Sequence, residues 1–121
     1  MNDYDLIQKT IFNYFEGYVS KDRSLLESAF ETEIVNMMGY WRIEDGSHEL
    51  FSRPISELID KWVSPEFEPF EFGDRKIISL HVFSNNGATA VFDCGGKFLD
   101  TFQLVKRYDQ WKIVNKFFVD Q

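Results

Sequence analysis

Residues 98–119 read FLDTFQLVKRYDQWKIVNKFFV, and this stretch decides the fold. Two arms rich in aromatic and β-branched residues flank Asp109-Gln110, and large apolar residues alternate with polar ones in each arm. Alternation with a period of two is typical of a strand with one buried face. A two-residue break between such arms has the length of a tight β-hairpin loop. Because an isolated hairpin is only marginally stable in water, we expect both strands to belong to a larger sheet with an apolar cover.

The length of the loop decides which side chains of the two arms share a face of the sheet. A two-residue loop at Asp109-Gln110 pairs Phe102 with Phe117, whereas a three-residue loop would shift the partners of one strand. The first register gives the more apolar face, and we take that face as the side of an internal cavity. This face carries Asp100, Phe102, Leu104, Trp111, Ile113, Asn115 and Phe117.

Further strands are predicted upstream of this hairpin. Residues 76–84 and 88–93 have strand composition and flank Asn86-Gly87, which is a strong hairpin-turn signal. Residues 34–41 and 48–51 indicate a shorter hairpin nearer the N-terminus. The sequence therefore predicts four consecutive antiparallel strands after one short hairpin.

Three helices are predicted before these four strands. Residues 4–19 place apolar side chains at spacings of three and four, which gives one apolar stripe. A short second helix follows Asp22, a candidate N-cap, and a third begins at Pro54, where a missing N–H costs nothing. Residues 65–75 alternate phenylalanine with acidic residues, and we expect an extended segment lying over an apolar surface.

The composition describes a single globular domain over residues 1–121, with 44% hydrophobic and 17% aromatic residues. A net charge of −7 argues against nucleic-acid binding, which needs clustered basic residues. One cysteine, Cys94, excludes an internal disulfide, and two histidines are too few for a convincing metal site. No apolar run is long enough to span a membrane, and Asp3 and Asp5 stand where a signal peptide would be basic and then apolar. We therefore expect a soluble cytoplasmic protein without metal or cofactor.

The order of elements is α+β, and the sequence resembles the nuclear-transport-factor-2-like superfamily, also called cystatin-like or SnoaL-like. The closing strands, FLDTFQLVK followed by WKIVNKF, resemble its putative lumazine-binding branch. This resemblance implies a cone-shaped fold in which three N-terminal helices pack on a curved antiparallel sheet around a ligand cavity. It also implies a homodimer packed through the outer sheet face, to which we expect Val105, Val114 and Phe118 to contribute. Where relatives often carry a histidine, this chain has Phe30-Glu31-Thr32, so a role that rests on that histidine is absent.

Asp100 is the most interesting single residue, because it stands in a strand between Leu99 and Phe102 and matches the branch's aspartate. In ketosteroid-isomerase-like relatives, an apolar site can hold a carboxylic acid protonated so that it donates a hydrogen bond. The plainer interpretation is that Asp100 faces solvent, caps a turn, or pairs with a cation such as Lys97. Asp100→Asn separates these interpretations, since it should cost stability only if Asp100 is paired.

Eight residues are predicted to line the cavity. Tyr14 and Tyr18 lie four apart on the apolar stripe of the first helix, where a hydroxyl could meet a ligand carbonyl or simply belong to the core. Trp41 and Trp62 could form a flat wall for an aromatic ligand, although packing explains them equally well. The remaining four come from the closing hairpin and are Asp100, Phe102, Asn115 and Phe117.

The residues predict a domain that binds a small hydrophobic or aromatic molecule, lumazine-like by resemblance, with no assigned catalysis. The alternative is a cofactor-free isomerase, dehydratase or cyclase that uses acid–base chemistry, and it needs a base near the cavity. Glu31, Glu33 and Asp60 are the candidates for that base. A third interpretation is a structural dimer module. A deep cavity with convergent polar groups would favour a ligand or a substrate over the module.

Overall fold

A computed structural model describes residues 2–121 of the chain. Along the chain its elements are α1 (Asp3–Val19), α2 (Arg23–Ala29), β1 (Asn36–Arg42), β2 (His48–Pro54), α3 (Ile55–Trp62), β3 (Lys76–Ser84), β4 (Gly87–Cys94), β5 (Phe98–Arg107) and β6 (Gln110–Asp120). The fold is α+β, as the sequence predicts, and every expected helix and strand is present. Within residues 2–121, no helix is long and apolar enough to cross a membrane.

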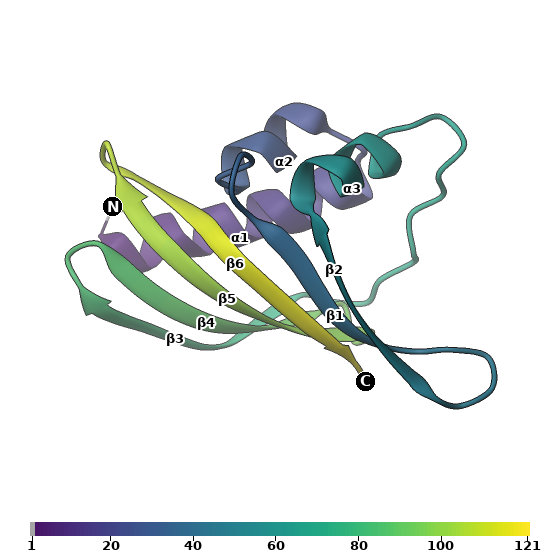
Figure 1. Ribbon diagram of the computed structural model, residues 1–121. Coiled ribbons are helices and arrows are strands. Elements are labelled where there is room, and N and C mark those ends of the chain that lie inside the picture. Colours follow the sequence, from purple (N-terminus) through teal and green to yellow (C-terminus); the bar gives the residue numbers. More distant parts are fainter. Residues whose placement is uncertain (1) are drawn as a thin grey trace.

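The six strands form one sheet in the order β2-β1-β6-β5-β4-β3. All neighbours are antiparallel except β1 and β6, which pair in parallel, with Met38 opposite Phe117. The sequence indicates the antiparallel neighbours but not this parallel pair. Figure 1 shows the three helices gathered on one side of the sheet, with α1 running across β3 to β6. One face of the sheet is therefore covered by helices and the other is not.

Helices α1 and α2 each begin at a side chain that caps their first turn, and they pack closely against each other. The Asn2 side chain accepts a hydrogen bond from the Asp5 N–H at 2.9 Å, and the Asp22 side chain caps α2 from the Leu25 N–H. At Gly17, a Cβ atom would lie 2.8 Å from Cγ of Leu26, so the absence of a side chain lets α2 approach α1 closely. The caps fix where each helix begins, and the close approach at Gly17 packs α2 against α1.

Helix α1 is fixed to the sheet through both its buried stripe and its polar residues. Ile7 and Ile11 are fully buried in the core. The buried Thr10 hydroxyl donates to the Trp111 carbonyl at 2.9 Å, and the Trp111 indole N–H donates to Asp3 Oδ1 at 3.0 Å. The N-terminal half of α1 is therefore tied to β6 by directional bonds as well as by packing.

The loop of the β5–β6 hairpin is Tyr108-Asp109, one residue earlier than predicted. Both residues have positive φ angles, of 54° and 60°, and Arg107 pairs with Gln110. Two consecutive positive φ angles define the type I′ turn, whose twist matches that of the flanking strands. The predicted register is wrong for this reason, because it was built on a loop at Asp109-Gln110.

A β-bulge at Val114 changes the register a second time. Gln103 pairs with Asn115, but the next residue of β5, Leu104, pairs with Ile113, so Val114 has no partner of its own. One extra residue in a strand moves every later side chain to the other face. Beyond the bulge, the buried face of β6 therefore carries Lys116 and Phe118, and the opposite face carries Asn115 and Phe117.

Three predictions made from the hairpin are wrong in consequence. Asn115 and Phe117 point away from the helices, so they cannot line a cavity on the helix side. Phe118 is 5% exposed and belongs to the core, so it cannot contribute to an interface on the outer face. The alternating pattern identified the strands correctly but could not reveal where the alternation skips a residue.

Residues 64–75 connect α3 to β3 without regular secondary structure, as the sequence predicts. We call them the 64–75 segment. The Lys21 ammonium donates to the carbonyls of Ser64 and Phe67, and the Phe70 N–H donates to the Tyr18 hydroxyl at 3.1 Å. Figure 1 shows the segment running from the end of α3 down toward β3, and the rings of Phe70 and Phe72 in it pack against Phe98 of β5. A few bonds therefore hold a segment that has no sheet partner.

Candidate functional site

A cavity of about 420 Å³ lies on the helix-covered side of the sheet. Eleven of its 18 lining residues are aromatic, so its wall consists mainly of flat apolar rings. The aromatic lining residues are Tyr14, Phe15, Tyr18, Trp41, Phe51, Trp62, Phe67, Phe70, Phe72, Phe98 and Phe118. They come from α1, β1, β2, α3, the 64–75 segment, β5 and β6, so the cavity depends on the whole fold.

The rings of the wall pack against one another mainly edge to face or tilted. Tyr18 and Trp62 meet with ring centroids 5.2 Å apart at 82°, and Phe98 and Phe118 meet at 5.1 Å and 65°. Trp41 lies tilted against Phe98 at 5.4 Å. Each such ring pair contributes about 0.5–1.5 kcal/mol of stability in addition to the free energy gained by burying its apolar surface. The cavity wall is therefore held in place by the protein itself.

Gly39 on β1 makes room for part of this wall. A Cβ atom built at Gly39 would lie 2.4 Å from the Phe118 ring and 2.8 Å from the Phe51 ring. No side chain fits in that space without displacing an aromatic ring. The rings of Phe51 and Phe118 can pack directly over the backbone of Gly39 because glycine has no side chain.

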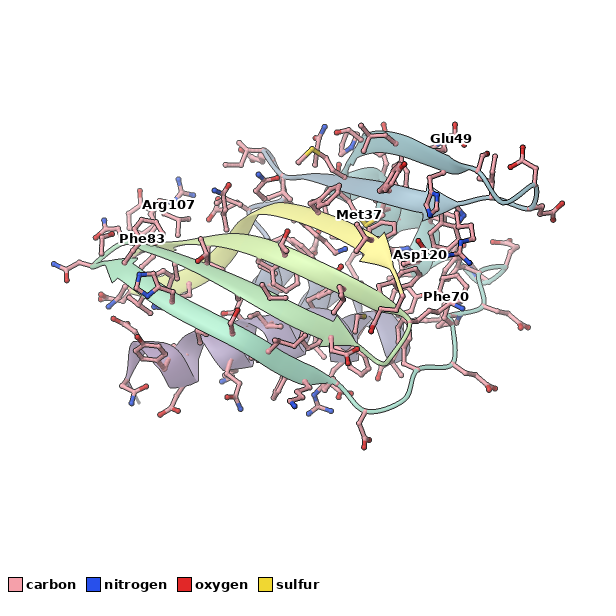
Figure 2. All side chains as sticks on the ribbon, turned by 90° about the horizontal axis from the view of Figure 1, so that it is seen from below. Met37, Glu49, Phe70, Phe83, Arg107 and Asp120 are labelled. Atoms are coloured by element: carbon pink, nitrogen blue, oxygen red, sulfur yellow. The ribbon has the colours of Figure 1, made fainter. Side chains whose placement is uncertain are left out.

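The mouth of the cavity carries charged side chains. Glu49 and Arg53 on β2 and Lys61 on α3 line the cavity and are exposed to solvent. Figure 2, which views the sheet from the face opposite the helices, shows Glu49 and Phe70 toward the end of the sheet where Asp120 lies. These exposed charges mark where the cavity meets solvent.

The inner end of the cavity holds a buried ion pair. Lys116 lines the cavity, and its Nζ lies 2.9 Å from Oδ1 of Asp100, although only 2% and 1% of these side chains are exposed. The same ammonium lies 5.3 Å from the Tyr14 ring centroid and 4.9 Å from that of Phe118. Two aromatic faces and a carboxylate therefore surround a single positive charge. Oδ2 of Asp100 has no hydrogen-bond partner among the described residues.

This environment keeps the neighbouring acidic groups neutral. Burial, and next the negative charge of Asp100, raises the pKa of the Tyr14 hydroxyl well above its ordinary value. The same two causes, in the same order, raise the pKa of the Cys94 thiol, which also lines the cavity. At neutral pH, Tyr14 therefore carries its proton and can donate it in a hydrogen bond, while Cys94 is a thiol and a poor nucleophile.

The predicted cavity residues fall into three groups. Tyr14, Tyr18, Trp41 and Trp62 line the cavity. Asp100 and Phe102 are buried on the same face of the sheet but do not line it. Asn115 and Phe117 lie on the outer face, where they line a second hollow of about 370 Å³ together with residues of β3, β4 and β5.

Sequence reasoning missed Lys116 and the phenylalanines of the 64–75 segment. Lys116 could be found only by knowing that the alternation of β6 skips Val114, because a lysine in a strand normally faces solvent. For Phe67, Phe70 and Phe72, the repeated spacing was visible, and the predicted apolar contact is present, but nothing in it identified a cavity.

The residues considered as catalytic bases lie elsewhere. Glu31 pairs with Arg107 at 2.9 Å, and Asp60 pairs with Arg23 at 2.8 Å on the surface. Glu33 is exposed to solvent, and none of the three lines the cavity. Within the described part of the chain, no group of three or more His, Cys, Asp and Glu side chains could hold a metal ion. The cavity therefore brings together aromatic rings and one ion pair.

Comparisons with known proteins agree on the fold. Residues 2–119 match the sequence family described as Putative lumazine-binding. The chain is similar to an NTF2-like protein of unknown function from Shewanella baltica, with a TM-score of 0.77 and 24% identity over 98% of this chain and 94% of that one. A second such protein, from Methylobacillus flagellatus, gives 0.75 and 25% over 98% and 92%. A ketosteroid isomerase-like protein from Erwinia carotovora gives 0.68 and 13% over 99% and 98%. No curated protein sequence matches.

Proposed function

Because the chain belongs to the family described as Putative lumazine-binding, within the NTF2-like superfamily, we propose that its aromatic cavity binds a flat, ring-containing small molecule. The curved sheet and the helices would form the cone around that ligand. A lumazine, which is a fused two-ring heterocycle with ring carbonyl groups, is the first compound to test. The protein acts in this proposal by binding, and no reaction is assigned to it.

The observation that carries this proposal is the aromatic cavity itself. Its volume of about 420 Å³ lies within the range of about 300–1,000 Å³ typical of small-molecule sites. A domain that needed these rings only for stability would pack them together and leave no such space. Flat rings such as Trp41 and Trp62 offer large contact areas, with few rotatable bonds to fix on binding.

The protonation and hydrogen bonding of the polar groups at the cavity favour binding over acid–base catalysis. Tyr14 and Cys94 are held in their protonated forms, and Asp100 already accepts a hydrogen bond from Lys116. A general base must be free to take a proton from the substrate. The likeness to a ketosteroid isomerase-like protein, at 13% identity, concerns the fold alone.

The test is a calorimetric titration of the protein with lumazine. We expect saturable binding with one site per chain and a rise in the thermal midpoint that grows with ligand concentration. Trp41→Ala removes part of the wall and should weaken binding by about 10-fold or more, since a buried aromatic contact contributes over 1 kcal/mol.

Tyr108→Ala is the matched control, because this side chain is 86% exposed in the hairpin loop and lies outside the cavity. It should leave the affinity unchanged. If neither lumazine nor other flat heterocycles of similar size produce heat or a thermal shift, the proposed function is wrong.

We also propose that the chain forms a homodimer through the outer face of its sheet. That face carries several half-buried apolar side chains, and no helix covers them (Figures 1 and 2). They are Met38, Val91, Val105, Phe117 and Val119. Covering such a face is a common reason for symmetric association. Sedimentation that detects only a 14.3 kDa species at micromolar concentration would contradict this proposal.

A further inference from the structure

The ammonium group of Lys116 has more hydrogen-bond donors than protein partners. A lysine side chain offers three N–H donors. One of them is used by Oδ1 of Asp100 at 2.9 Å, which is the one hydrogen bond of this ammonium to the described residues. The rings of Tyr14 and Phe118 stabilise the charge but do not accept a conventional hydrogen bond. Two donors therefore remain on the ammonium of a residue that lines the cavity.

The charge balance at this point indicates what kind of group can meet these donors. Asp100 and Lys116 carry opposite charges, are both almost wholly buried, and together are neutral. A carboxylate or phosphate beside them would be an uncompensated charge in an aromatic cavity, which is costly. A cation would have no acceptor on Lys116. A neutral oxygen acceptor has neither disadvantage and is held by a charge-assisted hydrogen bond.

We propose that the cavity selects an aromatic or conjugated molecule with a neutral carbonyl oxygen, such as a cyclic amide, an aryl ketone or a quinone, and that Lys116 binds this oxygen through its Nζ. This inference rests on the proposed function, since it names the class of ligand for the same cavity. Asp100 is a positioning residue here, because it holds the ammonium at the inner end of the cavity without lining the cavity itself.

Two probes of nearly the same shape test the proposal. 2-Acetonaphthone has a carbonyl group where 2-isopropenylnaphthalene has a C=CH₂ group, so the second is more apolar but cannot accept a hydrogen bond. We expect the wild-type protein to bind the ketone at least about 10-fold more tightly, as expected for a hydrogen bond to a charged group. A cavity that recognises only apolar area would prefer the hydrocarbon.

A paired substitution shows whether Lys116 is responsible. Lys116→Met together with Asp100→Leu removes both charges, and exchanging a buried ion pair for apolar residues of similar volume is often tolerated. In this variant, the preference for the ketone should disappear while the hydrocarbon still binds. Lys76→Met is the matched control, because Lys76 is exposed on β3 and does not line the cavity. It should keep the preference.

A measurement on the wild-type protein covers the case in which the double variant fails to fold. With ¹⁵N-labelled lysine, the ammonium resonance of Lys116 should shift on addition of the ketone and not on addition of the hydrocarbon. Equal affinity for both probes, or an unmoved resonance under saturation, overturns the role of Lys116 and leaves the binding function intact. Tighter binding of 2-naphthoate than of the ketone overturns the neutral-carbonyl class. If lumazine binds but the ketone does not, the proposed ligand class is wrong. If none of the three compounds binds and lumazine does not bind either, the proposed function itself fails.

Discussion

Nζ of Lys116 lies 2.9 Å from Oδ1 of Asp100 across the two strands that close the chain, with almost no solvent contact at either group. The two side chains approach each other because the bulge at Val114 turns Lys116 toward the helix-covered face. Removing two charges from water is expensive, and each partner compensates the other. The polar centre of the cavity thus depends on one extra residue in a strand.

Asp100→Asn should destabilise the protein by about 3–5 kcal/mol at pH 7, because it leaves the Lys116 ammonium buried without a counter-charge. Urea denaturation measures this difference directly. Asp60→Asn is the control, since it breaks an exposed ion pair with Arg23 and should cost less than about 1 kcal/mol. If Asp100→Asn is neutral or stabilising, Asp100 does not bear the charge that balances Lys116.

Trp111→Ala should cost much more stability than Phe117→Ala. Trp111 is 3% exposed in the core and donates a hydrogen bond to Asp3, so we expect a loss of about 3–5 kcal/mol. Phe117 is half-buried on the outer face, and its truncation should cost about 1–2 kcal/mol in the monomer. Chemical denaturation of both variants in parallel checks the order. Equal losses would contradict the position of Phe117 on the outer face of the sheet, beyond the bulge at Val114.

Asp3→Asn should lower stability at pH 7, and this loss should shrink as the pH falls through the folded-state pKa of Asp3. The hydrogen bond from the Trp111 indole, and next that from Lys106, lowers the pKa of Asp3. A carboxylate whose folded-state pKa is lowered stabilises the fold above its unfolded pKa, and this contribution disappears as the pH falls through the folded value. The difference between wild type and variant should therefore close on acidification. It is measured by denaturant titrations at a series of pH values.

Asp5→Asn is the control for this pH dependence, because Asp5 lies in the same helical turn but is exposed to solvent. It tests the part of the effect that comes from the helix dipole alone. A gap between wild type and Asp3→Asn that stays constant from pH 7 to pH 2 would show that the ionised carboxylate is not what stabilises the fold.

Lys21→Asn should loosen the 64–75 segment without disturbing the turn. Lys21 has a φ of 54°, and asparagine tolerates this left-handed conformation but cannot reach the carbonyls of Ser64 and Phe67. We expect faster hydrogen exchange in the 64–75 segment and faster ligand dissociation, because three phenylalanines of the cavity wall belong to it. Unchanged exchange in this segment would show that packing alone holds it.

Much of the fold could be predicted from periodicity, whereas the details of the site could not. The stripe of α1 predicted Tyr14 and Tyr18 on the inner side because a helix has a regular period that nothing interrupts. The predicted register of the β5–β6 hairpin is wrong beyond Val114, because a bulge leaves no signature in an alternating pattern of apolar residues. Its loop, Tyr108-Asp109, also lacks the glycine that usually marks a type I′ turn.

The parallel pairing of β1 with β6 was hidden for a different reason. Met38 and Phe117 are far apart in sequence, and an interaction between distant segments leaves no local pattern in either of them. The cavity depends on this pairing, since Trp41 of β1 and Phe118 of β6 meet in its wall with ring centroids 6.0 Å apart. Sequence reasoning could name candidates on each strand but could not bring the two strands together.

The position of β6 has a consequence for how the domain is made. It is the last of the six strands along the chain, yet it lies between β1 and β5 in the sheet. While the chain emerges from the ribosome, β1 and β2 can form a hairpin, and β3 to β5 a separate meander, but the two halves have no strand to join them. Closing such a distant contact is slow, and the open edges of β1 and β5 are exposed until it happens. We expect the domain to fold only once β6 has left the ribosome, and to depend on chaperones in that interval.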